Sequence, residues 1–218
     1  MESQKSEAFR FLPKSLLRWG ANLGQRILQV LVALKLSPNA LTVLGLLAGM
    51  AAGLLFFLER PLWAWLALFV CSTLDVLDGK VAVLTNRTSA FGAILDSTLD
   101  RYSEFFIYLG LALHFRTHWG LWLAFLAFLG SMMVSYTKAR AEGLGFACHI
   151  GIMQRAERMV LLGSGALLGA VFKIFDAALI TALALIALFS NITAVQRVLL
   201  VKKAEQQRLL KREASDHE

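Results

Sequence analysis

The sequence predicts an all-α integral membrane protein with six transmembrane helices preceded by an N-terminal amphipathic interfacial helix. Hydrophobic residues make up 57% of the 218 residues, charged residues only 17%, and the mean hydropathy is +0.62. This balance is typical of chains whose apolar surface faces lipid. Apolar runs close to the length of about 20 residues needed for a helix to cross a bilayer recur along the chain, and turn residues or basic residues separate them.

The basic residues indicate a membrane orientation and not a nucleic-acid partner. The formal net charge is +7, but Lys and Arg gather at the chain ends and in segments 79–90 and 138–158. Basic residues concentrate on the cytoplasmic side of membrane proteins. An even number of spans then places both termini in the cytoplasm of a multi-pass protein of the cell (inner) membrane. Cys71 and Cys148 lie in or beside apolar runs and are predicted to be packing residues.

Residues 1–36 are predicted to form a cytoplasmic arm and the interfacial helix. From residue 9 to residue 34, Phe, Leu and Trp alternate at roughly helical spacing with the basic residues Arg10, Lys14, Arg18 and Arg26. A helix of this kind lies in the membrane surface with its apolar side buried. The alternative is a solvated arm.

Residues 37–200 are predicted to form the six-helix transmembrane domain. Ser37 and Pro38 suit the N-cap and the first turn of the first helix. The apolar run from Met159 to Leu188 is too long for one span, and Lys173 and Asp176 mark a turn inside it. The expected spans are residues 38–58, 62–83, 91–114, 119–138, 158–173 and 177–199. Residues 201–218 are predicted to be a charged cytoplasmic tail.

The segment from Asp75 to Asp100 carries four carboxylates between strongly apolar sequences. Asp75 and Asp78 are three residues apart and Asp96 and Asp100 are four apart, so each pair shares one face of its helix. The predicted orientation places all four near the cytoplasmic surface, facing each other across the second and third spans. Charged groups at membrane depth are costly and usually functional.

Four acids without an equal number of nearby bases indicate that metal ions supply the counter-charge. Carboxylate oxygens suit Mg²⁺ or Mn²⁺, and no Cys or His accompanies them as a zinc site would require. Two carboxylate pairs can hold two ions, and two-metal sites stabilise the attacking and leaving oxygens of a phosphoryl displacement. The alternative is a structural network of the acids with Lys80, Arg87 and Arg101.

This segment resembles the signature of the CDP-alcohol phosphatidyltransferase family. The signature reads Asp, two residues, Asp-Gly, two residues, Ala-Arg, eight residues, Gly, three residues, Asp, three residues, Asp. The matching positions are Asp75, Asp78, Gly79, Ala82, Gly92, Asp96 and Asp100. Val83 stands where the signature has Arg, and Lys80 or Arg87 are candidates to replace that charge. The resemblance covers about residues 30–200 and implies a homodimer.

The resemblance implies an enzyme that moves a phosphatidyl group from CDP-diacylglycerol to an alcohol and releases CMP. It implies that Asp75, Asp78 and Asp96 ligate metal. Asp100 would be the general base and a further metal ligand. The implied CDP-lipid site comprises Asn39, Thr42, Gly79, Lys80, Ala82, Arg87 and Gly92. For the residues at the start of the first span, helix capping is an equally good explanation.

Basic residues at the ends of the last three spans form a candidate site for the phosphate of the acceptor. Arg captures phosphate with two parallel hydrogen bonds, and Arg155 and Arg158 share one helical face. Positive-inside topology alone would also explain them. These segments resemble the subgroup that makes phosphatidylinositol phosphate, with Ala156 where that subgroup has Pro. The candidate acceptor-phosphate residues are Lys138, Arg140, Arg155, Arg158 and Arg197.

The predicted acceptor is therefore a phosphorylated alcohol, inositol 1-phosphate, with glycerol 3-phosphate as the rival. A divalent-cation transporter is the alternative from another class. Such transporters place acids near the midplane, on broken helices in repeated halves, and the sequence shows no repeat. Val83 is the one hint of an inactive scaffold. His114 and His118, beside Trp119 at an outer turn, are predicted to lie at the membrane interface.

Overall fold

The computed structural model describes residues 28–215, and within this range it consists of helices joined by short connections, without a β-strand. The all-α prediction is confirmed for these residues. Of the predicted interfacial helix, residues 9–34, only the helical turns from residue 28 onward lie in the described range. The long helices are α2 (Pro38–Phe57), α3 (Pro61–Leu84), α4 (Ala90–His114), α5 (Gly120–Gly143), α6 (Arg155–Phe172) and α7 (Phe175–Ser215).

Three of these helices are long and apolar enough to cross a bilayer, namely α2, α5 and the Phe175–Leu210 part of α7. Large apolar side chains are exposed around the bundle, among them Leu54, Trp63 and Trp122, of which Trp122 is 67% exposed. This is the surface that a lipid environment favours. The remaining long helices, α3, α4 and α6, contain the four predicted acids together with Arg155 and Arg158.

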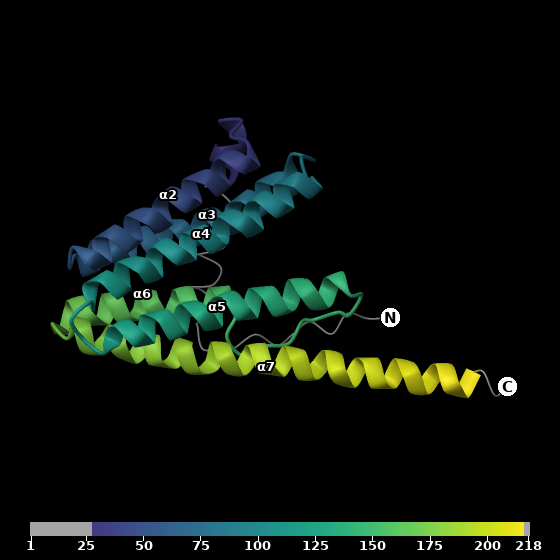
Figure 1. The fold of residues 1–218 in the computed structure, drawn as a ribbon. Helices are drawn as coiled ribbons and strands as arrows, with labels where there is room; N and C mark the ends of the chain where they lie inside the picture. The colour runs from purple at the N-terminus through teal and green to yellow at the C-terminus, as the bar shows by residue number, and fades with distance from the viewer. Residues whose placement is uncertain (1–27, 216–218) are drawn as a thin grey trace, which may run out of the picture.

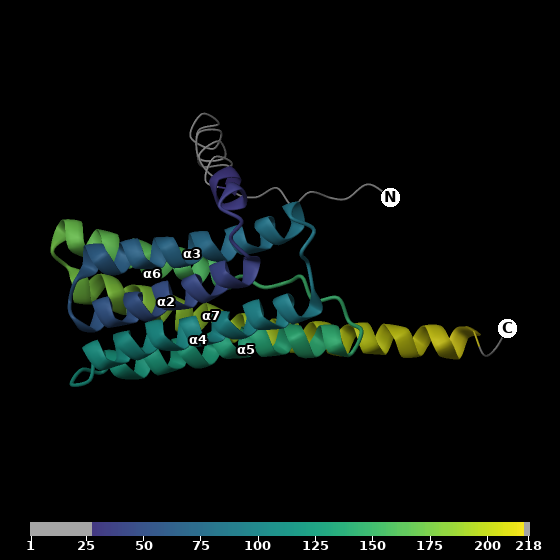
Figure 2. The same cartoon turned by 90° about the horizontal axis from the view of Figure 1, so that it is seen from above.

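The helices form two groups of three. α2 packs against both α3 and α4, α7 packs against both α5 and α6, and contacts of α3 with α6 and of α4 with α5 join the groups. Figure 1 shows the groups converging at the end that carries the α2–α3, α4–α5 and α6–α7 turns and diverging toward the other end. In Figure 2 the helix axes run in nearly the same direction, and α7 projects beyond the rest.

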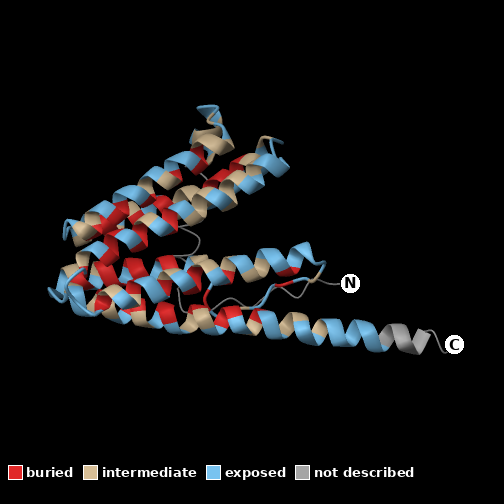
Figure 3. Ribbon diagram, in the orientation of Figure 1, coloured by how far each residue is buried: buried red, intermediate tan, exposed pale blue. Residues whose placement is uncertain are grey.

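The apolar core lies at the converging end. Buried side chains from both groups meet there, including Phe56, Leu68, Ile107, Leu162 and Leu183, and Figure 3 shows the buried positions gathered between the helices. Complete burial of one such side chain contributes roughly 1.5–3 kcal/mol. The core therefore holds the bundle together at one end and leaves the diverging end for polar side chains.

α2 and α4 approach closely because glycines face each other between them. A Cβ on Gly53 would overlap the carbonyl of Phe106, and a Cβ on Gly110 would overlap the backbone of Gly53. Small residues permit such close helix packing in membranes. The contact fixes α4, which carries Asp96, against α2, which carries Thr42.

The sequence predicted that α3 and α4 face each other as consecutive antiparallel spans. They make few close backbone contacts, because α2 packs against both of them. Side chains bridge the space between them. One example is Cys71 Sγ, which lies 3.3 Å from Ser103 Oγ. The acids on these two helices therefore have room around them.

Helix ends differ from the predicted spans where the sequence becomes charged. α5 continues to Gly143, beyond the expected end at residue 138, and α6 begins at Arg155 instead of residue 158. α7 passes the predicted tail boundary at residue 200 and continues to Ser215. Ala, Lys, Arg, Glu and Gln are good helix formers, so the backbone stays helical after the apolar sequence has ended.

The side chain of His114, which the sequence predicted to lie at an outer turn at the membrane interface, is enclosed between helix ends. Its side chain is 6% exposed, and its Nε2 lies 2.8 Å from Asp176 Oδ1, while Nδ1 lies 3.8 Å from Glu59 Oε1. The ends of α2 and α4 and the start of α7 meet at this point, and they enclose the ring. His118 remains exposed.

We predict that Gly53→Ala lowers the stability of the protein, because the added methyl group would overlap the backbone of α4. Overpacking of this kind costs about 1–3 kcal/mol. Thermal unfolding in detergent measures the change. Gly143→Ala is the matched control, since a Cβ there meets nothing within 4 Å. Equal melting temperatures for the two variants would contradict the proposed close contact.

Candidate functional site

The structure brings three of the four predicted carboxylates together. Asp75 on α3 and Asp96 and Asp100 on α4 each place a carboxylate oxygen so that these atoms all lie within 4.8 Å of one another. Asp96 and Asp100 are one turn apart and therefore point in the same direction. We call these three residues the acid group.

The acid group fits a hard divalent cation. All three residues are partly buried, and Asp96 Oδ1 is buried without a hydrogen-bond partner. Buried oxygens are nearly always satisfied in proteins, so this atom is a good candidate to bind the cation. Carboxylate oxygens from separate residues are the donors that Mg²⁺ and Mn²⁺ prefer.

Asp78 is placed differently from the other three acids. It is buried, with 4% of its surface exposed, and its Oδ2 accepts a hydrogen bond from Thr42 Oγ1 at 2.7 Å. Its Oδ1 accepts one from the backbone N–H of Gly79 at 2.6 Å. The structure thus joins Asp78 to α2 and does not bring it into the acid group.

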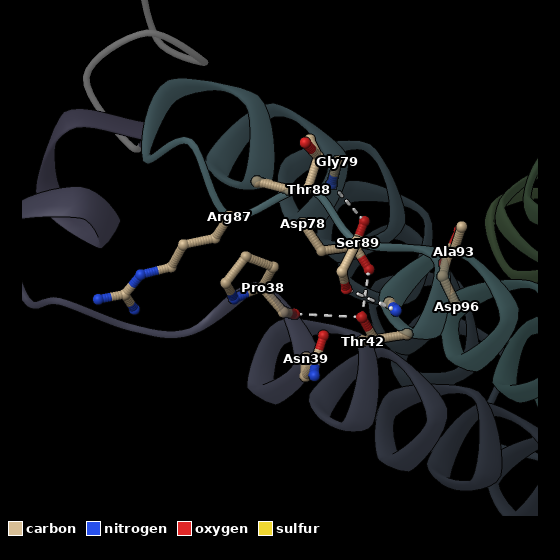
Figure 4. A pocket seen from close by; sticks show the side chains of 12 residues that line it. Pro38, Asn39, Thr42, Asp78, Gly79, Arg87, Thr88, Ser89, Ala93 and Asp96 are labelled. Atoms are coloured by element: carbon tan, nitrogen blue, oxygen red, sulfur yellow. Dashed lines mark hydrogen bonds between the residues drawn. The ribbon is translucent and has the colours of Figure 1, made fainter.

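A cavity of about 220 Å³ opens beside Asp78 and Asp96, between the start of α2 and the α3–α4 connection. We call it the α2 cavity, and Figure 4 shows the residues that line it. Val83 is 66% exposed and is not among them. Six of the seven residues predicted for the CDP-lipid line this cavity, namely Asn39, Thr42, Gly79, Ala82, Arg87 and Gly92.

Some details of the α2 cavity differ from the prediction. Lys80 lines a separate cavity between α3 and α6, and the side chain of Arg87 extends away from Asp78 and Asp96 (Figure 4). Sequence reasoning missed Thr88 and Ser89, which also line the cavity. Ser89 caps α4 by accepting a hydrogen bond from Gly92 N at 3.0 Å, and a Ser directly before a helix was the available signal.

A second cavity, of about 200 Å³, lies beside Asp100 and is rich in basic side chains. We call it the basic cavity. It also contains Glu104, which the sequence reasoning did not single out. Arg140 is exposed and is not among the lining residues. Four of the five predicted acceptor-phosphate residues line the cavity, namely Lys138, Arg155, Arg158 and Arg197.

Arg155 connects the acid group with the basic cavity. Its Nη2 lies 2.9 Å from Asp100 Oδ1, and its Nε lies 3.5 Å from Asp75 Oδ2. Its Nη1 donates to the backbone carbonyl of Asp100 at 2.9 Å. The sequence assigned Arg155 to a phosphate alone, whereas its guanidinium also balances part of the negative charge of the acid group.

Arg158 and Glu104 form a buried ion pair in the wall of the basic cavity. Both side chains are 1% exposed, and Arg158 Nη2 lies 2.6 Å from Glu104 Oε1. Glu104 follows Asp100 by four residues, on the same face of α4 and directly before the apolar run from Phe105 to Leu113. That spacing was the signal that could have identified it.

α7 holds the segment that leads into α6. Arg197 Nε donates to the carbonyl of Ile150 at 2.9 Å, and Thr193 Oγ1 accepts from the backbone N–H groups of Ile152 and Met153 at 3.2 and 3.1 Å. Arg197 also donates from Nη1 to the carbonyl of Val134 on α5. These bonds fix the start of α6, and with it the arginines of the basic cavity.

Comparisons with known proteins agree on one family. Residues 35–202 match the family described as CDP-alcohol phosphatidyltransferase. The chain is 39% identical over 180 residues to the archaetidylinositol phosphate synthase of Pyrococcus horikoshii, and the aligned segment covers 82% of this chain and 90% of that protein. It is 30% identical over 167 residues to the phosphatidylinositol phosphate synthase of Mycobacteroides abscessus, and the aligned segment covers 74% of this chain and 76% of that protein.

Solved structures give the same result. The phosphatidylinositol phosphate synthase of Mycobacterium tuberculosis with CDP-DAG bound superposes with a TM-score of 0.74 at 30% identity, over 83% of this chain and 94% of that chain. The structure of that enzyme in complex with manganese and citrate also gives a TM-score of 0.74 at 30% identity, over 82% of this chain and 88% of that chain.

We predict that Asp96→Asn weakens the binding of Mn²⁺ by at least about tenfold, because the variant loses a negative ligand. Electron paramagnetic resonance of free Mn²⁺, titrated with the protein in detergent, measures the affinity. Asp176→Asn is the control, since Asp176 pairs with His114 at the converging end. Equal Mn²⁺ affinities for the two variants would show that the acid group does not hold the ion.

Proposed function

The chain belongs to the CDP-alcohol phosphatidyltransferase family, and on this premise we propose that it transfers the phosphatidyl group of CDP-diacylglycerol to inositol 1-phosphate and releases CMP. The two relatives described above are named archaetidylinositol phosphate synthase and phosphatidylinositol phosphate synthase. The structural observation that carries the proposal is the placement of the acid group between two cavities. Asp96 lines the α2 cavity, and Asp100 lines the basic cavity.

The two cavities suit the two substrates. The α2 cavity, with Asn39, Thr42 and the α3–α4 connection, would receive the cytidine diphosphate part of the lipid. The basic cavity would receive the phosphate of the acceptor, because guanidinium and ammonium groups bind phosphate strongly. The reacting phosphorus would then lie at the acid group. A cationic alcohol such as choline or ethanolamine has no anionic group that would need the basic cavity.

The proposed reaction is a single displacement at the phosphorus that bears diacylglycerol. A hydroxyl oxygen of the acceptor forms the new P–O bond, the P–O bond to CMP breaks, and CMP leaves. Asp100 would accept the proton of that hydroxyl, because it is the acid that belongs to the acid group and also lines the basic cavity. Lys138, Arg155 and Arg158 would hold the acceptor's phosphate during this step.

Mg²⁺ or Mn²⁺, as two ions, would be held by Asp75, Asp96 and Asp100 together with Asp78, and would supply charge neutralisation for the diphosphate. Asp78 would contribute a lone pair other than the one that accepts the hydrogen bond from Thr42. The residues of the chain prepare the site in other ways. Arg155 balances the charge of Asp75 and Asp100, and the Gly53 contact keeps α2 and α4 in place.

The chain is a membrane protein, and we propose that all of α2–α7 span the bilayer with both termini in the cytoplasm. The diverging end, with residues 85–89 and 144–154, would face the cytoplasm, where the phosphorylated acceptor is found. Basic residues support this orientation. The proposed parts are an arm and interfacial helix (1–36), the transmembrane catalytic domain (37–200) and a cytoplasmic tail (201–218). The functional unit would be a homodimer.

The test is CMP release by the purified protein in detergent with Mg²⁺ and CDP-diacylglycerol. Inositol 1-phosphate should support release, and glycerol 3-phosphate and unphosphorylated inositol should support much less. EDTA should stop the reaction, and Mg²⁺ or Mn²⁺ should restore it. Faster release with glycerol 3-phosphate would instead identify a phosphatidylglycerophosphate synthase. If no acceptor releases CMP, and vesicles that contain the protein take up Mn²⁺, the chain is a divalent-cation transporter.

Asp100→Asn should lower kcat by about 10²–10⁴-fold, because the amide keeps the volume of the side chain but cannot accept the proton. Rates of CMP release at saturating substrates measure the effect, and size-exclusion chromatography in detergent shows whether the variant is folded. Asp176→Asn should keep the activity of the unmodified chain. A folded Asp100→Asn protein that retains turnover would remove Asp100 from the role of base.

Arg155→Ala should raise the KM for inositol 1-phosphate by at least about tenfold and change the KM for the CDP-lipid much less, because the contact that is lost is the proposed one with the acceptor's phosphate. Initial rates with each substrate varied in turn provide both constants. Arg116→Ala, at an outer turn, serves as the control for loss of a basic side chain. Equal rises of both KM values would argue against a phosphate site for the acceptor.

A further inference from the structure

Glu104 is a buried carboxylate that the proposed reaction does not use. It lies on α4, one turn beyond Asp100, and its side chain is 1% exposed. A buried carboxylate is unfavourable unless it is paired and hydrogen-bonded. Its partners therefore show what it does for the molecule.

One oxygen of Glu104 meets both arginines at the start of α6. Oε1 lies 2.6 Å from Arg158 Nη2 and accepts a second hydrogen bond from Arg158 Nε at 3.2 Å. The same oxygen lies 3.8 Å from Arg155 Nη1. Among the ion pairs of residues 28–210, whose side chains are described, Glu104 is the carboxylate that lies within 4.0 Å of Arg158. The position of Arg158 thus depends on Glu104.

This pairing uses one edge of the Arg158 guanidinium and leaves donors free. An arginine has five N–H donors in a fixed planar arrangement. Nε and Nη2 donate to Glu104, and Nη1 donates to the carbonyl of Met153 at 3.4 Å. One further N–H remains on Nη1 and one on Nη2. Since Arg158 lines the basic cavity, these two donors are available to a phosphate there.

Charge gives a second reason for a carboxylate at this position. Several basic side chains line one cavity of about 200 Å³, namely Arg101, Lys138, Arg155, Arg158 and Arg197. Like charges gathered in so small a space repel each other. Asp100 and Glu104 are the acids that line the same cavity. Asp100 is paired with Arg155. Glu104 is therefore the group that keeps Arg158 beside the other cations before an acceptor binds.

We propose that Glu104 is a positioning residue for the acceptor substrate. It holds Arg158 directly, and Arg155 through the shared oxygen, so that the remaining N–H groups of both arginines are directed at the acceptor's phosphate. Glu104 itself does not bind the acceptor. This inference rests on the proposed function, because it assigns the basic cavity to a phosphorylated acceptor.

The experiment compares Glu104→Gln, which removes the charge at nearly constant volume, with Glu104→Asp, which keeps the charge on a shorter side chain. Glu104→Gln should raise the KM for inositol 1-phosphate by about tenfold or more and leave the KM for the CDP-lipid within about twofold. Glu104→Asp should restore part of the affinity for the acceptor. Glu205→Gln, an exposed position on α7, is the matched control and should behave as the unmodified chain does.

A double variant tests whether Glu104 acts through Arg158. If it does, Glu104→Gln should raise the acceptor KM much less in the Arg158→Gln background than in the unmodified chain, because the side chain that Glu104 holds directly is already absent. Independent, multiplied effects of the two substitutions would overturn the proposal. An equal rise of both substrate KM values, or a fall in kcat alone, would also overturn it.

Calorimetric titration of the detergent-solubilised chain with inositol 1-phosphate and with inorganic phosphate, without CDP-lipid, separates this inference from the proposed function. Binding that Glu104→Gln weakens supports the positioning role even if the chain releases no CMP, which is the result that would end the proposed function. Absence of binding to the unmodified chain would overturn the positioning role. Loss of folded protein in both Glu104 variants would assign Glu104 to folding alone and overturn it too.

Discussion

The polar end of this bundle depends on one row of alternating charges. Asp75 and Asp100 flank Arg155, and Arg155 and Arg158 share Glu104. An uncompensated charge in a poorly solvated site costs several kcal/mol, so each member of the row requires its neighbours. The apolar core at the converging end holds the helices together. Charged side chains of α3, α4 and α6 can therefore meet at the other end, although α4 makes few close backbone contacts with α3 or α6.

The sequence predicted the helices well where an apolar run ends at a turn, and less well where it ends at charged residues. The expected ends of α2, α3 and α4 lie within a residue or two of those observed, since Pro, Gly, Ser and Asn mark the turns. The sixth span was expected to end near residue 200, and α7 continues beyond it to Ser215, through a tail of high helix propensity. Hydropathy indicates where a helix leaves the apolar environment, whereas helix propensity decides where the helix itself ends. The two positions differ in sequences rich in Lys, Glu and Gln.

Within the site, local spacing was predictable and distant partners were not. Asp96 and Asp100 are four residues apart and therefore lie on one face of α4, and the structure brings them together with Asp75. The bond of Asp78 to Thr42 joins residues 36 apart in the chain, and that of Glu104 to Arg158 joins residues 54 apart. No pattern of residue spacing within one helix predicts contacts between residues so far apart in the chain. Arg140, two residues beyond Lys138 on a helix, points about 200° away from it, which explains why only Lys138 lines the basic cavity.

The two cavities also bear on how the proposed reaction would be organised in time. Because each cavity is lined by its own set of residues and they adjoin through the acid group, a ternary complex of protein, lipid donor and acceptor can form before any bond breaks. The phosphatidyl group then passes directly from donor to acceptor, without a covalent bond to a side chain of the protein. A sequential scheme, with inversion of configuration at phosphorus, follows from this layout, in contrast to a ping-pong scheme through a covalent adduct.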